Sequence, residues 1–177
     1  MNDFRVELMS LEQVDSRVKF LREENTIKNI FMEQPVSLES TKEWCSKIIK
    51  DNSRKDFVFL RNDFVLGFAG LVNISRIDGR AEFYIFITDN EQGKGYGTAF
   101  TKWLLAFAEV EMNLRKVSLY VTAGNEPAVA LYEKVGFINE GVLKKHSWFR
   151  GLYVDRLIFS KFLNNKPEFD NLYKHII

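Results

Sequence analysis

The segment Gln92–Thr98 carries the most specific chemical signal in the chain. Three glycines, Gly93, Gly95 and Gly97, alternate with other residues between an apolar run, "AEFYIFIT", and an amphipathic run that begins after Thr98. A turn without Cβ atoms at the start of a helix exposes several backbone N–H groups at the positive end of the helix dipole. The segment is therefore typical of an anion site, and a phosphate suits it best.

The two familiar phosphate loops do not match this turn. A Walker loop requires Gly-Lys followed by Ser or Thr, whereas Gly95 is followed by Tyr96. The dinucleotide fingerprint requires a further glycine where Thr98 stands. Taken alone, the run is also compatible with a flexible turn between a strand and a helix.

Three other residues have side chains suited to catalysis or binding. Tyr132 lies on the apolar face of a short helix expected over residues 125–135, where packing in the core is the simplest interpretation. Asn125 stands at the start of that helix and is a good N-cap. Glu82 lies on the strand that leads to the glycines, on the same face as Tyr84 and Phe86 by alternation.

The elements that position these residues follow from hydrophobic spacing. We expect a first strand at Phe4–Leu8, a helix from Leu11 to about Glu24 and a second helix that begins at Ser37 or Ser40 and ends near Lys50. Three consecutive strands follow, then the glycine turn, a helix, a strand, the short helix and two closing strands, with no linker or repeat. This order predicts a mixed α/β domain, in which the tail over residues 164–177 has no readable role.

Composition excludes several classes of function. With 177 residues and a formal net charge of +1, the chain has neither the length for several domains nor the basic field of a nucleic-acid-binding protein. No window approaches the roughly 20 apolar residues of a membrane span, and the N-terminus lacks a secretory signal pattern. One cysteine, Cys45, and two histidines make a metal centre unconvincing. We expect a cytoplasmic protein without metal, nucleic-acid or membrane partners.

Two ordered motifs resemble those of the GCN5-related N-acetyltransferases. Gln92-x-x-Gly95-x-Gly97 is similar to the pyrophosphate-binding motif of that family, and "NEPAVALYEKVGF", residues 125–137, is similar to its second block. The segment "EGVLKKHSWFRGLYVDRLIFS" looks like the closing hairpin of the branch that contains ribosomal-protein and spermidine acetylases. The resemblance covers residues 57–162 well and the first fifty residues loosely.

The resemblance implies a single acetyltransferase domain over residues 1–177, with acetyl-CoA as co-substrate. It implies a mixed, mostly antiparallel sheet of about seven strands that splays apart between strands 4 and 5, flanked by about four helices. Residues 57–162 would bind acetyl-CoA, and residues 1–56 would form the acceptor side. The residues implied to hold acetyl-CoA, by backbone or side chain, are Phe86, Ile87, Thr88, Gln92, Gly93, Lys94, Gly95, Tyr96, Gly97, Thr98 and Asn125.

The same resemblance makes Tyr132 the general acid that protonates the leaving CoA thiolate. An alkyl amine has a pKa near ~10.4 and must lose a proton before it attacks. Glu82 is the candidate base, acting through water; His146, expected in a loop, and a chain of water molecules without a single base remain alternatives.

The acceptor stays open at this point. A polyamine, an amino-sugar nucleotide and a protein N-terminus are all compatible with the resemblance, and a small molecule is favoured over a protein. "FMEQP" is similar to the spermidine type and "LREENTIKNIFM" to the amino-sugar type. A non-catalytic acyl-CoA sensor and an aminoglycoside acetyltransferase are further alternatives. A homodimer through the closing strands, which carry Trp148 and Phe149, is also compatible with the resemblance.

Overall fold

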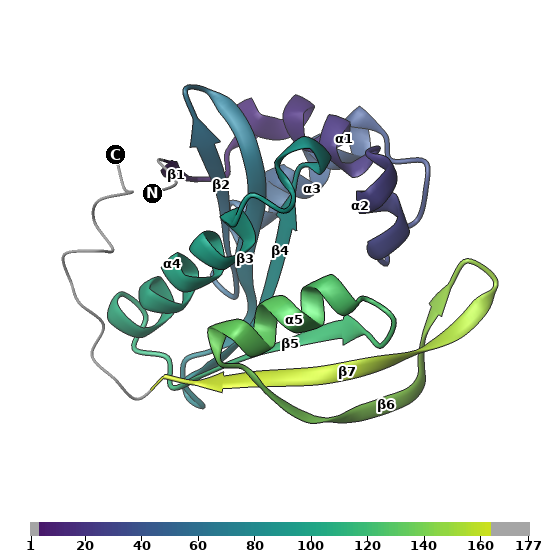
Figure 1. Ribbon diagram of the computed structural model, residues 1–177. Coiled ribbons are helices and arrows are strands. Elements are labelled where there is room, and N and C mark those ends of the chain that lie inside the picture. The colour runs from purple at the N-terminus through teal and green to yellow at the C-terminus, as the bar shows by residue number, and fades with distance from the viewer. Residues whose placement is uncertain (1–3, 164–177) are drawn as a thin grey trace.

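The computed structural model describes residues 4–163, so the expected tail over 164–177 lies outside the described residues. One seven-stranded sheet runs through the domain in the order β1-β2-β3-β4-β5-β7-β6 (Figure 1). The strands are β1 (Arg5–Leu8), β2 (Lys55–Arg61), β3 (Phe64–Ser75), β4 (Arg80–Ile87), β5 (Lys116–Thr122), β6 (Ile138–Phe149) and β7 (Leu152–Phe162). Among the described strands only β4 and β5 pair in parallel, so the expected mixed, mostly antiparallel sheet is confirmed.

Five α-helices occur among the described residues, one more than expected. They are α1 (Val14–Leu21), α2 (Glu24–Asn29), α3 (Leu38–Ile48), α4 (Tyr96–Val110) and α5 (Glu126–Val135). The additional element is α2, which begins where the helix expected from Leu11 to about Glu24 was expected to end. A 3-10 turn, Leu11–Gln13, precedes α1, and a second short helix starts at Glu24.

The helices cover the two faces of the sheet and create two hydrophobic cores. On one face, α4 and α5 pack on the central strands, with Phe100 stacked on Phe59 at 3.9 Å between ring centroids. On the other face, α1 and α3 bury Val14, Phe20 and Cys45 against β2 and β3. The central strands are therefore covered on both faces, as their apolar runs require.

Local signals explain where the central helices begin and end. Asn125 caps α5 by accepting a hydrogen bond from the Ala128 N–H at 3.3 Å, as expected from the sequence. Gly136 ends that helix in the left-handed conformation, with φ of 91°. On the apolar face of α4, Phe100, Trp103 and Leu104 are buried, which confirms the helical spacing.

The closing hairpin is longer than expected and changes the setting of His146. The segment around His146 belongs to β6 rather than to a loop, because β6 and β7 pair on both sides of it. The register shifts between Leu143 and Ser147, where Lys145 takes a positive φ of 48°. His146 thus lies in a bulged part of a strand, and its side chain is exposed.

Candidate active site

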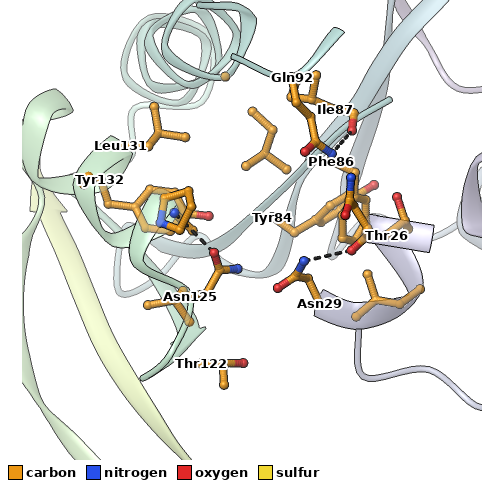
Figure 2. Close-up of a pocket in the computed structure, with 18 of the residues that line it drawn as sticks. Thr26, Asn29, Tyr84, Phe86, Ile87, Gln92, Thr122, Asn125, Leu131 and Tyr132 are labelled. Atoms are coloured by element: carbon orange, nitrogen blue, oxygen red, sulfur yellow. Dashed lines mark hydrogen bonds between the residues drawn. The ribbon is translucent and has the colours of Figure 1, made fainter. Parts of the chain in front are cut away.

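A cavity opens where β4 and β5 separate. Their parallel pairing covers three positions and ends at Glu82 and Ser118, although β4 continues to Ile87 and β5 to Thr122. The cavity of about 730 Å³ lies along the separated parts. Figure 2 shows Leu131, Tyr132 and Asn125 on one side of it and Tyr84, Phe86 and Thr26 on the other. The expected splay is therefore confirmed, and it leaves one edge of β4 available to an extended ligand.

The glycine turn forms part of the wall of this cavity. Gly93 and Gly95 have φ values of 75° and 88°, a region that residues with a Cβ rarely adopt. Gly95 is the N-cap of α4, and no side chain caps the helix there. The first N–H groups of α4 therefore lack intrahelical partners at the positive end of the helix dipole, where a phosphate binds well.

Some residues of this turn line the cavity, and others do not. Gln92, Gly93, Gly95, Gly97 and Thr98 line it. Two other expected residues, Lys94 and Tyr96, have side chains engaged elsewhere. Lys94 forms an ion pair with Glu91 at 3.3 Å. The buried Tyr96 hydroxyl accepts a hydrogen bond from Arg61 at 2.7 Å, so only the backbone of Tyr96 remains for a phosphate.

Gln92 has a structural role that the sequence motif alone did not reveal. Its Nε2 donates to the Ile87 carbonyl at 3.1 Å (Figure 2). The same Nε2 donates to Asp89 Oδ1 at 3.2 Å. The other oxygen of Asp89 accepts from the Asn25 N–H at 3.2 Å. Gln92 therefore joins the end of β4 to the glycine turn, and Asp89 joins the same turn to α2.

Thr88, the last of the expected residues along β4, lies just beyond the strand. Its Oγ1 donates to the Leu66 carbonyl at 3.2 Å, and it is not among the residues that line the cavity. Phe86 and Ile87 do line the cavity. The cavity-lining part of β4 thus ends at Ile87.

Tyr132 is buried beside the splayed strands. It is 8% exposed, and its ring lies 6.1 Å from that of Phe83 and 5.7 Å from that of Phe137, measured between centroids. Burial raises the pKa of the Tyr132 hydroxyl above its usual value, and the nearby Arg156 cation opposes this rise only in part. The phenol therefore keeps its proton at neutral pH, as a general acid must.

The two candidate bases lie at different distances from the cavity. Glu82 forms the last pair of the parallel ladder with Ser118 and is not among the cavity-lining residues. Proton transfer to its carboxylate thus requires bridging water. His146 is exposed on β6 and stacks on Tyr120, with 6.2 Å between ring centroids; Tyr120 lines the cavity.

Several polar residues that line the cavity were not identified from the sequence. Asn25, Thr26 and Asn29 of α2 line the cavity, and α2 itself was missed because its residues are mostly polar. Arg156 of β7 also lines it, with its guanidinium 4.1 Å from the ring centroid of Phe31 and Nη2 donating to the Tyr120 carbonyl at 2.9 Å. The available signal for Arg156 was a cationic residue within the expected closing strand, in "VDRLIF".

The charge of the cavity wall is neutral to positive. Among the described residues that line it, Glu91 is the one carboxylate, and it is paired with Arg61 and Lys94. Lys134 and Arg156 supply positive charge. Within residues 4–163, no three His, Cys, Asp or Glu side chains are grouped to hold a metal ion. None of the described helices is long and apolar enough to cross a membrane.

A splayed sheet with an uncapped, glycine-rich helix start beside the gap defines an acyl-CoA-binding acyltransferase architecture. The family model described as acetyltransferase (GNAT) domain matches residues 5–138. The chain therefore belongs to the GNAT acetyltransferase family, and acetyl-CoA is its co-substrate.

Relatives of this chain include enzymes of known acceptor. The spermidine N(1)-acetyltransferase of Vibrio cholerae is 33% identical over 89% of this chain and 95% of its own length. The enzyme of the same name from Escherichia coli is 32% identical over 84% and 81% of the two chains. The solved Vibrio cholerae spermidine N-acetyltransferase, in complex with CoA and spermine, superposes with a TM-score of 0.85 at 28% identity, covering 90% of this chain and 95% of that one.

These comparisons confirm the expected family, fold and reaction class. The chain is an acetyl-CoA-dependent N-acetyltransferase that transfers acetyl to an amine of a small molecule. The roles of individual residues remain predictions, although the structure brings Tyr132, Asn125, Phe86 and the glycine turn to one cavity.

Proposed function

We propose that the acceptor is a primary amine on a small molecule whose other groups are neutral or anionic, represented best by an amino-sugar nucleotide. The observation that carries this proposal is the charge of the cavity wall. The hydroxyls and amides of Thr26, Asn25 and Asn29 suit a hydroxylated acceptor, and Arg156 suits an anionic one. A polycation would favour unpaired carboxylates, and the one described acidic residue of the wall, Glu91, is already paired.

A polyamine is the second candidate, and the relatives favour it. Both curated relatives described above are named spermidine N(1)-acetyltransferases and match most of this chain. The two candidates differ in charge. Negative charge in the cavity wall would favour binding of a polyamine, and positive charge would favour an anionic acceptor. The charge of the preferred acceptor decides between them.

The proposed mechanism assigns one task to each part of the cavity. Acetyl-CoA supplies an activated thioester. The backbone N–H groups of Gly95–Thr98 hold its diphosphate, and the free edge of β4 at Phe86 and Ile87 pairs with its extended arm. Asn125 hydrogen-bonds the same arm while it caps α5. Tyr132 donates its proton to the departing sulfur, and Glu82 receives the proton of the incoming ammonium through water.

The proposed division of the domain into an acetyl-CoA-binding part and an acceptor part agrees with which residues line the cavity. Residues 57–162 supply the strands and helix ends beside the acetyl-CoA site. Residues 1–56 supply α2 and the residues after it on the acceptor side, which supports the proposed division within one acetyltransferase domain.

The test is CoA-thiol release with a panel that contains an amino-sugar nucleotide, spermidine, spermine, an aminoglycoside and a short peptide. We expect the amino-sugar nucleotide to have a kcat/KM at least about tenfold above that of spermidine, because one well-placed charge contact changes binding by about this factor. Tyr132→Phe serves as a control for enzymatic turnover. The reverse order would establish the polyamine as acceptor, and preference for the peptide would contradict both candidates.

We further propose that the protein works in the cytoplasm as a homodimer. Use of acetyl-CoA and a single, buried, free cysteine, Cys45, support the location. The exposed Trp148, Leu152 and Tyr153 at the end of the closing hairpin support self-association. Analytical ultracentrifugation tests the dimer, and Trp148→Ser with Tyr153→Ser is expected to shift it towards monomer.

A further inference from the structure

A second cavity lies on the face of the sheet that α1 and α3 cover. Its volume is about 350 Å³, which is within the range of small-molecule sites. The wall is formed by α1, α3 and the segment between α2 and α3, and consists of Arg17, Leu21, Met32, Glu33, Gln34, Pro35, Val36, Ser40, Thr41 and Trp44. Met32 also lines the acetyl-CoA cavity, so the two spaces adjoin at that residue.

Arg17 presents a buried cation to this second cavity. The residue is 4% exposed, and its guanidinium carbon lies 4.5 Å from the Trp44 ring centroid and 5.0 Å from that of Phe68. Aromatic faces stabilise a cation but accept no conventional hydrogen bond from it. Its Nη1 is buried without a hydrogen-bond partner, and within residues 4–163 no carboxylate lies within ion-pair distance of the guanidinium.

The nearest buried carboxylate is already engaged. Asp56 accepts two hydrogen bonds from Arg54, both at 2.7 Å, and one from the Tyr84 hydroxyl at 2.5 Å. Arg54 also lies 5.4 Å from the Trp44 ring centroid. Two guanidinium groups thus flank Trp44 beside a single buried carboxylate, which leaves one positive charge unbalanced. Burial of an unbalanced charge is costly, so an anion at this point is favoured.

A second donor in the same wall points to the same kind of ligand. The Gln34 Nε2 atom is buried and has no hydrogen-bond partner. Gln34 reaches the cavity from the segment between α2 and α3, whereas Arg17 reaches it from α1. Two unsatisfied donors from different elements therefore border one cavity, and a ligand with acceptor oxygens satisfies both.

We propose that this Arg17 cavity binds a small organic anion through a carboxylate or phosphate group. Arg17 supplies the charge and Gln34 a neutral donor. The anionic group belongs either to the amine acceptor, which would extend past Met32 from the main cavity, or to a separate effector. Glu33, an exposed residue of the same wall, places a negative charge there that opposes the binding of an anion.

The test is titration of the intact protein with inorganic phosphate and with citrate, followed by calorimetry and by thermal unfolding. We expect saturable binding by the wild type and about ten- to hundredfold weaker binding by Arg17→Met, because a charge-assisted hydrogen bond is lost. Gln34→Leu removes the second donor from a half-buried position and should weaken binding about three- to tenfold. Glu33→Gln should bind at least as tightly as the wild type.

Arg76→Met is the matched control, because Arg76 is exposed on the surface and outside the cavity wall. Equal binding by Arg17→Met and Arg76→Met, or no saturable binding by the wild type, would overturn the proposal. If Arg17→Met does not fold, the Gln34→Leu and Glu33→Gln pair still decides. Weaker binding by Gln34→Leu together with undiminished binding by Glu33→Gln supports the anion site, whereas unchanged binding by Gln34→Leu contradicts it.

A kinetic arm separates the two sources of the anion. Competition of citrate with the amine acceptor, seen as a raised acceptor KM at constant kcat, places the acceptor's own acidic group in the Arg17 cavity. A changed kcat at saturating acceptor identifies a separate effector. This arm rests on the proposed function, whereas the binding titration does not, so failure of one is distinguishable from failure of the other.

Discussion

Glu82 and Ser118 form the last pair of the parallel ladder between β4 and β5. Beyond this pair the two strands separate, and the cavity lies along the separated parts. The pair therefore marks the closed end of the gap, which leaves the Glu82 carboxylate next to the site rather than inside it.

Glu82→Gln tests whether a carboxylate at this position accepts the amine proton through water. We expect kcat/KM at neutral pH to fall about a hundredfold, which is the lower range for loss of a general base. The deficit should shrink as the pH approaches the pKa of the acceptor amine, where the amine loses its own proton. A pH series of initial rates measures both effects.

Glu140→Gln is the control, because Glu140 pairs with Lys116 at 2.8 Å and is not among the cavity-lining residues. Equal rates for Glu82→Gln and the wild type across the pH series would show that water alone carries the proton.

Tyr132→Phe removes the hydroxyl that we expect to protonate the departing thiolate. The turnover number should fall by about a hundredfold or more, while the KM for acetyl-CoA stays within about threefold, because the acid acts only during the chemical step. Steady-state kinetics with the preferred acceptor measures the split. Tyr153→Phe, at an exposed position of the closing hairpin, is the control and should leave both constants unchanged. A rise in KM with unchanged kcat would assign Tyr132 to binding instead.

The ionisation of buried tyrosines predicts how stability varies at alkaline pH. Burial raises the pKa of Tyr132 and of Tyr84 above the usual value near ~10, which applies to the unfolded chain. Both groups therefore stabilise the fold fully below pH ~10, and this contribution is lost as pH rises from there through the folded-state pKa. Each contributes a slope of up to about 1.4 kcal/mol per pH unit in that window.

Urea unfolding of the wild type and Tyr132→Phe between pH 8 and pH 11 checks this expectation. The variant should lose stability less steeply, by about 1.4 kcal/mol per pH unit above pH ~10, and the two slopes should agree at lower pH. The same shift means that Tyr132 causes no descending limb in kcat below pH ~10. Parallel unfolding slopes throughout would contradict burial of the neutral phenol.

Gly95→Ala tests the turn at the start of α4. At φ of 88°, a residue with a Cβ costs about 1–2 kcal/mol, so the free energy of unfolding should fall by that amount. Displacement of the turn should also raise the KM for acetyl-CoA about tenfold, because hydrogen bonds to the diphosphate are lost. Thermal unfolding and acetyl-CoA titration of turnover measure the two effects.

Gly124→Ala is the matched control for that substitution. A Cβ at Gly124 meets no atom within 4 Å, and its φ lies outside the left-handed region. Both stability and KM should remain close to the wild-type values. A similar loss of stability and a similar rise in KM in the two variants would show that Gly95 has no special role.

Patterns within short segments determined much of this protein. Alternation predicted β4, helical spacing predicted α4 and the length of α5, and Asn125 and Gly136 marked the ends of α5. The glycine turn and the second motif were sufficient for the family, because a phosphate site at a helix start depends on neighbouring residues of one segment. The co-substrate could thus be predicted before any contact between distant residues was known.

Only the tertiary structure showed which residues surround the space where we propose that the acceptor binds. The place where β4 leaves β5, the position of Glu82 at that point and the approach of Arg156 to Phe31 all depend on contacts between residues far apart in the sequence. The unbalanced charge of Arg17 became visible only when Asp56 was found paired with Arg54, since a sequence shows which charges exist but not which ones meet. Local propensity sets the elements, and long-range packing sets the charge and shape of the space between them.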